Sequence, residues 1–161
     1  MVYAGWVVVP TCMAKLSGNR DRVATLARQR DSASPYCNVI VHSERHGDIP
    51  GKAQKFARAW YSFDGREFQE TRMSNVKWIM TTSPDKTFAT IRHIYGDPVP
   101  ADAIACGKQH DSGVYYAAIA HGKHGQVPGK AQHQTCWYPW GGKEFVTHDF
   151  SWVVVRSAQQ Q

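Results

Sequence analysis

The feature that most constrains this chain is an internal duplication. The phrase HGDIPGKAQ, residues 46–54, returns as HGQVPGKAQ, residues 124–132. The likeness continues downstream, because WYSFDGREF (60–68) corresponds to WYPWGGKEF (137–145), and a Trp that begins an apolar run follows in each copy. So many ordered matches indicate two tandem repeats, and a solenoid would need at least about three. We therefore expect the copies to pack against each other as one pseudo-symmetric body.

The two copies divide the chain. The first repeat is expected to span residues 1–80, with a diverged N-terminal part, and the second residues 88–155. Residues 156–161 read as a polar tail. A length of 161 residues suits one domain or two small, intimately packed units.

Strand signals dominate both repeats. Short runs rich in β-branched and aromatic residues alternate with turn signals such as Asp64-Gly65 and Gly141-Gly142. This pattern predicts an all-β fold, a sandwich or a barrel, made of two tandem pseudo-symmetric antiparallel β repeats packed into one compact body. The one helical candidate is the stretch from Met13 to Arg30, whereas its counterpart, Ala103 to Gly107, alternates like a strand.

Composition narrows the class of protein. Hydrophobic residues make up 42% and charged residues 20%, which is enough for a real core. No apolar run approaches the roughly 18 residues of a membrane span, and the N-terminus does not resemble a secretory signal. The four Cys are not spaced as CxxC and do not occupy equivalent places in the copies, which favours free, buried thiols. We expect a cytoplasmic protein, or one released without a signal peptide.

The net charge of +6 allows contact with nucleic acid or an anionic membrane surface. The basic residues are nevertheless scattered, apart from a modest cluster between Arg20 and Arg30. The charge pattern therefore does not favour nucleic acid as a partner, and a basic protein of that kind stays a third hypothesis.

The repeated motifs resemble the DM-nine repeat family. They are Pro50-Gly51-Lys52 followed by Asp64-Gly65-Arg66-Glu67, and Pro128-Gly129-Lys130 followed by Gly141-Gly142-Lys143-Glu144. The resemblance covers essentially the whole chain in two units. It implies an invertebrate-type lectin with a largely β fold, recognition of mannose-type glycans in innate immune pattern recognition, and a homodimer.

The resemblance also implies site residues. In mannose-binding members an upstream Asp and the Lys of Pro-Gly-Lys hold the sugar, which carries over to Asp31 with Lys52 and to Lys130 in the second repeat. The second acid is Asp111 by the match between repeats, whereas the Asp31-to-Lys52 spacing lands on Gln109. A carboxylate accepts two hydroxyl protons and an ammonium donates to oxygen, so such a pair suits a sugar diol.

We expect Pro-Gly-Lys to be a stiff turn that aims an exposed lysine. Gly51 and Gly129 then allow the chain to turn, and Lys52 and Lys130 contribute little to stability. The alternative is a hairpin turn whose lysine is merely solvated.

Other constellations favour neither catalysis nor metal binding. His42, His46, His121 and His124 lack ligand partners at zinc-like spacing, so we expect no metal and no cofactor. Glu67 and Glu144 are conceivable as the carboxylate pair of a glycosidase. Their equivalence within a repeat explains them without catalysis, and we expect each to hold a turn or pair with Arg66 or Lys143. Cys106 or Cys136 beside a His has no supporting spacing, so the protein is not expected to be an enzyme.

Trp60-Tyr61 and Trp137-Tyr138 form either a sugar-stacking platform or core. Adjacent strand residues point to opposite faces, and we expect the Trp of each pair to be the buried member. Trp6, Trp78 and Trp152 lie in apolar runs and are expected in the core. The sequence thus predicts a mannose-binding lectin. The alternative is a non-enzymatic protein-interaction or stress-response module that has lost sugar binding.

Overall fold

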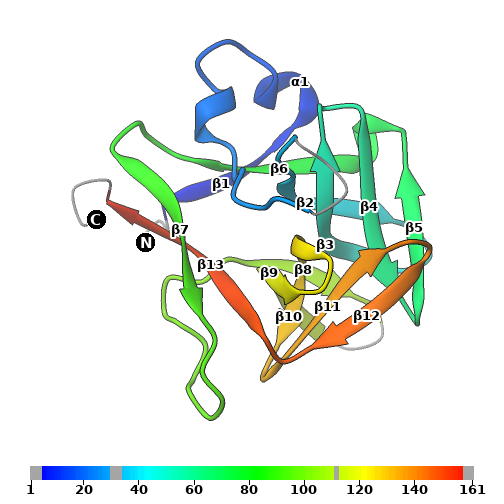
Figure 1. Ribbon diagram of the computed structural model, residues 1–161. Coiled ribbons are helices and arrows are strands. Elements are labelled where there is room, and N and C mark those ends of the chain that lie inside the picture. Colours follow the sequence, from blue (N-terminus) through cyan, green and yellow to red (C-terminus); the bar gives the residue numbers. More distant parts are fainter. Residues whose placement is uncertain (1–4, 30–33, 111–112, 158–161) are drawn as a thin grey trace.

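The computed structural model describes residues 5–29, 34–110 and 113–157, which form an almost entirely β structure (Figure 1). The strands are β1 (Trp6–Pro10), β2 (Cys37–Ser43), β3 (Gly47–Gln54), β4 (Arg58–Phe63), β5 (Arg66–Glu70), β6 (Val76–Thr81), β7 (Lys86–Arg92), β8 (Ala105–Gln109), β9 (Gly113–Gly122), β10 (Gly125–Gln132), β11 (Thr135–Trp140), β12 (Lys143–Thr147) and β13 (Phe150–Ser157). A four-residue helix, α1 (Thr11–Ala14), and the 3-10 turns η1 (Arg20–Arg22) and η2 (Met73–Asn75) complete the described structure. The predicted all-β class is confirmed.

Antiparallel strands close into a ring. The order is β3-β4-β5-β12-β11-β10-β9-β8, and it closes because β8 pairs with both β3 and β9. Strands β2, β6 and β1 extend the sheet from β3, and β13 and β7 extend it from β9. The two halves meet at β5 and β12, which lie side by side in Figure 1, where Arg66 stands opposite Lys143.

The two repeats follow the same plan. Strands β2 to β6 pair with one another as β9 to β13 do, and β1 flanks β6 as β7 flanks β13. The isolated bridge between Gln29 and Gly125 of β10 matches the pairing of Gln109 in β8 with Gly47 of β3. Each repeat therefore contributes a short segment to the sheet of the other.

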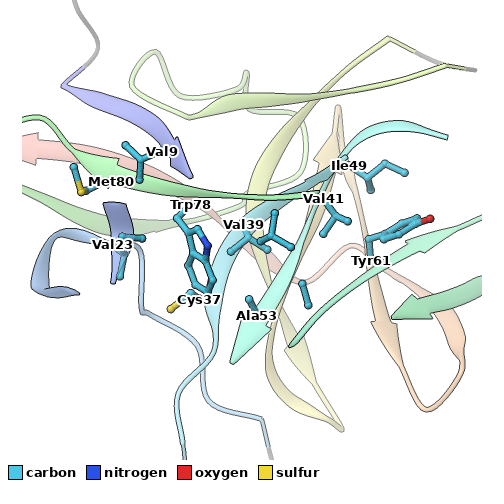
Figure 2. Packing of buried hydrophobic residues seen from close by; sticks show 13 residues of the cluster. Val9, Val23, Cys37, Val39, Val41, Ile49, Ala53, Tyr61, Trp78 and Met80 are labelled. Atoms are coloured by element: carbon cyan, nitrogen blue, oxygen red, sulfur yellow. The ribbon is translucent and has the colours of Figure 1, made fainter. Parts of the chain in front are cut away.

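Three apolar clusters fill the interior. One belongs to the first repeat and surrounds Trp78 (Figure 2), and a second surrounds Trp152 in the second repeat. The third draws on both repeats, through residues such as Ile40, Ile79, Ile119 and Val153. Burying each such aliphatic side chain contributes about 1.5–3 kcal/mol. The shared cluster therefore binds the repeats into one body.

The centre of strand β2 is a continuous apolar run, Val39 to Val41, because both of its faces are buried. Successive strand residues point to opposite faces. Val39 and Val41 enter the cluster of the first repeat, and Ile40 between them enters the shared cluster. A strand with a core on each face must be apolar at these positions, which Val39, Ile40 and Val41 provide.

The Pro-Gly-Lys motifs lie inside strands, not in turns. Pro50, Gly51 and Lys52 belong to β3 and pair with Ile40, Val39 and Asn38 of β2. The glycine is required by a close approach, since a Cβ on Gly51 would lie 2.3 Å from the carbonyl oxygen of Trp60. Gly129 stands in the same relation to Trp137, also at 2.3 Å. The predicted turn is therefore wrong, and the glycine allows β3 and β4 to approach closely.

The helical candidate from Met13 to Arg30 is also corrected. Of the described residues in this stretch, 13–29, only those in α1 and η1 are helical. From Val23 onward the described chain is extended and bridges neighbouring strands, with Val23 opposite Met80 and Ala27 opposite Tyr36. Pairing with the sheet overrides local helix propensity in this segment.

Candidate functional site

Lys52 projects from β3 into the boundary between the repeats. Only 4% of the residue is exposed. Its ammonium donates to Gln29 Oε1 at 2.6 Å and to the carbonyl oxygen of Pro139, in the other repeat, at 2.8 Å. Glu67 Oε2 lies 3.7 Å from the same nitrogen. The charge of Lys52 is thus shared among an amide, a carbonyl and a carboxylate.

Aromatic rings enclose this ammonium. Lys52 Nζ lies 5.4 Å from the ring centroid of Tyr36, 5.7 Å from that of Trp60 and 5.4 Å from that of Trp140. Tyr36 and Trp60 come from the first repeat and Trp140 from the second. Cation–π attraction strengthens when the cation is desolvated, as it is here.

Lys130 of β10 repeats the arrangement. It is 2% exposed, donates to Gln109 Oε1, and donates to the carbonyl oxygen of Ser62 in the first repeat at 2.7 Å. Glu144 Oε2 lies 3.2 Å from its ammonium. The rings of Phe63 and Tyr115 lie 5.5 and 5.4 Å away. We call the two sets of contacts the lysine clusters.

Each of the two glutamates connects its own lysine cluster to the tight turn of the opposite repeat. Glu67 Oε1 accepts a hydrogen bond from Gly142 N at 2.9 Å, and Glu144 Oε1 accepts one from Gly65 N at 3.1 Å. Each glutamate therefore supports the tight turn of the opposite repeat while its other oxygen faces its own lysine. The expected pairing with Arg66 or Lys143 is replaced by pairing with the buried lysines.

The exposure expected for Lys52 and Lys130 is wrong. The sequence predicts lysines exposed to bind a sugar, whereas both ammonium groups are desolvated and bonded to the opposite repeat. The reason is the strand register, which points them inward toward Pro139 and Ser62.

The proposed acids, Asp31 and Asp111, lie outside the described residues. Lys130 contacts Gln109, the residue that the Asp31-to-Lys52 spacing indicated as the alternative to Asp111. Its equivalent beside Lys52 is Gln29, which sequence reasoning missed. Aligning the repeats on Asp-Ser also places Gln29 opposite Gln109, so the signal was present in the sequence.

A second duplicated feature is an aromatic stack around a histidine. His46 lies against Phe63 with ring centroids 4.1 Å apart, and its Nδ1 pairs with Tyr61 Oη at 3.1 Å. His124 repeats this against Trp140 at 4.4 Å and Tyr138 Oη at 3.0 Å. The histidines thus have structural partners that the sequence did not predict.

The tyrosines, not the tryptophans, are the more buried members of their pairs. Tyr61 and Tyr138 are buried, whereas Trp60 and Trp137 are partly exposed, which corrects the prediction. Figure 2 shows the Tyr61 ring at one end of the cluster with its hydroxyl directed away from the aliphatic side chains. A buried tyrosine hydroxyl requires a hydrogen-bond partner, and His46 provides one for Tyr61 on the inner face of the strand. Trp78 and Trp152 are buried as predicted, and Trp6 is partly buried.

The four cysteines are free, and the prediction of buried thiols holds for Cys37 and Cys136, whereas Cys106 is partly exposed and Cys12 is exposed. Burial raises the pKa of Cys106 to about 12 and also raises the pKa of Cys136. A raised pKa disfavours the thiolate, which is the nucleophilic form.

Among the described residues no group of three or more His, Cys, Asp or Glu is placed to hold a metal ion. No helix in the same residues is long and apolar enough to cross a membrane. A scan against protein-family models found no match for this chain, and neither did a search of curated proteins.

Proposed function

We propose that the protein is a carbohydrate-binding protein that recognises mannose or mannose-containing glycans at two pseudo-equivalent sites. The observation that carries the proposal is the duplicated lysine cluster. Each cluster combines an ammonium, an amide oxygen and a carboxylate with partly exposed aromatic rings, Trp60 and Trp140 in one and Phe63 in the other. Sugars bind to such mixtures, because their hydroxyls need charged or amide partners and their C–H faces pack on rings.

The burial of the lysines restricts how they can contribute. With 4% of Lys52 and 2% of Lys130 exposed, the contact area available to a sugar on either side chain is small. Neighbouring groups must supply most of the contact, and Asp31 and Asp111 are the proposed carboxylates. Weak binding at each site would be strengthened by two sites per chain and by the proposed homodimer.

The test is calorimetric titration of the full chain with mannose, with galactose as the epimer control. Mannose should release heat and galactose should not. Asp31→Asn and Asp111→Asn should each remove about half of the binding sites and leave the melting temperature unchanged. Absence of mannose binding by the unaltered chain would rule the proposal out.

A second candidate is a non-enzymatic interaction or stress-response module that has lost sugar binding. The favouring observation is that Lys52 and Lys130 each bond a carbonyl of the opposite repeat, so stability alone accounts for their presence. Absence of retention on a glycan array, together with a fully folded chain, would select this candidate. Sedimentation velocity at increasing concentration tests the proposed homodimer under either reading.

A further inference from the structure

A groove of about 650 Å³ is lined by the loop before β3, the end of β4 and its turn into β5, β5 itself, and the residue that follows β8. Its basic side chains are Arg45, Arg66 and His110, and its aromatic ones are His46, Phe63 and Phe68. This volume lies within the range of small-molecule sites, which is roughly 300–1,000 Å³.

The rim of the groove carries more positive than negative charge. Arg45 and Arg66 are exposed, and within the described part of the chain neither guanidinium forms an ion pair with a carboxylate. Asp64 supplies one negative charge on the same rim. Arg66 also stands directly opposite Lys143 where the repeats meet, and like charges in that position repel. A bound anion would relieve this repulsion.

The aromatic side of the groove is rigid. The His46 ring lies 4.1 Å from Phe63 and 5.0 Å from Phe68 between centroids, and its bond to Tyr61 fixes its orientation. At the other side, His110 Nδ1 donates to the carbonyl oxygen of Arg45 at 3.1 Å, which ties the end of β8 to the loop before β3. The groove is therefore formed before any ligand arrives.

We propose that this groove binds a saccharide that carries an anionic group, a phosphate or a carboxylate. The guanidinium groups of Arg45 and Arg66 offer paired N–H donors that match these oxyanions. Phe63 and Phe68 are partly exposed and line the groove, so they offer apolar surface to the C–H groups of a sugar ring. The groove shares the Phe63 ring with the Lys130 cluster, but its two arginines belong to neither lysine cluster.

The second repeat does not reproduce the groove chemistry. Lys123 stands at the position of Arg45, and its ammonium lies 5.2 Å from the ring centroid of Phe145, the counterpart of Phe68. Gly141 replaces Asp64 and Lys143 replaces Arg66, so lysines stand at the positions of both groove arginines. We expect one anionic-saccharide site per chain.

The experiment titrates the full chain with glucose 6-phosphate, glucuronate, glucose and inorganic phosphate at low ionic strength, followed by NMR and calorimetry. Glucose 6-phosphate or glucuronate should bind at least tenfold more tightly than either glucose or inorganic phosphate. Shifts should centre on Arg66 and His110. Binding of inorganic phosphate as tight as that of the sugar acids would overturn the saccharide assignment, and no binding of any probe would overturn the site.

Substitutions sharpen the test. Arg45→Gln and Arg66→Gln should each weaken binding about tenfold and leave the fold intact, because both side chains are exposed. Lys77→Gln, at an exposed lysine of β6, is the matched control and should bind as the unaltered chain does. Equal affinity in all three variants would contradict the proposal. Mannose titration of the same variants separates the two sites, since their mannose binding should be unchanged.

Discussion

The ammonium of Lys52 donates a hydrogen bond to the carbonyl oxygen of Pro139, 87 positions away and in the other repeat. Lys130 makes the equivalent bond to Ser62. Neither lysine cluster is complete within one repeat, so each cluster stabilises the contact between the halves.

Lys52→Met tests this structural role. The substitution leaves the partly buried Glu67 and the buried Gln29 without their cation, and breaking such a pair costs about 3 kcal/mol. Urea denaturation should show that loss in the free energy of unfolding, and Lys130→Met should behave alike. Lys77→Met is the control, and an exposed site of that kind should change stability by no more than about 0.5 kcal/mol. If both lysine variants were as stable as the unaltered chain, the lysine clusters would contribute nothing to the free energy of unfolding.

Gly51→Ala tests the close approach of β3 and β4. The new methyl group would lie 2.3 Å from Trp60 O, so backbone must shift, at a cost of about 3 kcal/mol. Gly129→Ala should have the same effect. The comparison is Gly141→Ala, which meets open space but has a φ of +57°, and it should cost only about 1 kcal/mol. Thermal unfolding of the three variants gives the ranking, and a reversed order would be inconsistent with this packing.

The cysteines should react in a fixed order. Cys12 is exposed, whereas burial raises the pKa of Cys136 and keeps it as the thiol. At pH 8 a maleimide should label Cys12 within minutes and leave Cys136 unlabelled until the chain is unfolded. Peptide mapping by mass spectrometry identifies the labelled sites, and early labelling of Cys136 would contradict its burial.

His121 should make stability fall as the pH drops. Burial, and then the nearby Arg92, lower its pKa from 6.5, although the Asp149 carboxylate partly opposes them. Below about pH 6.5 the unfolded chain therefore binds more protons than the folded chain, and stability is lost as acidity increases. His121→Gln should flatten the change in melting temperature between pH 7 and pH 5. An identical slope in the variant would assign the effect to other groups.

The sequence predicts the class of fold well, and physical reasons limit the rest. Duplication, strand runs and turn dipeptides predict an all-β body with two halves, because these signals are local. The placement of Lys52 depends on β3 pairing with β2 and on Pro139 from the distant β11, and no local signal contains that information. The sequence places Gly51 in a turn for the same reason. Glycine is required there because the neighbouring strand β4 approaches closely, and no local signal shows this.

The histidine stacks show the same limit. His46 and His124 occupy equivalent positions in the two repeats, which indicates a shared role. The spacing in the sequence does not predict that Tyr61 and Trp140 are their contact partners. Gln29 could have been found by aligning the repeats on Asp-Ser. The aligned pair Gln29 and Gln109 then predicts one amide partner for each lysine.

The crossed bonds of Glu67 and Glu144 have a consequence for how such a chain can be divided. A polypeptide holding a single copy would bury a lysine without its carbonyl partner and leave a turn without its carboxylate. It could satisfy both only by associating with a second molecule of the same kind. Tandem fusion makes that association intramolecular, so that the partner is always present at high local concentration, and it leaves the two halves free to diverge.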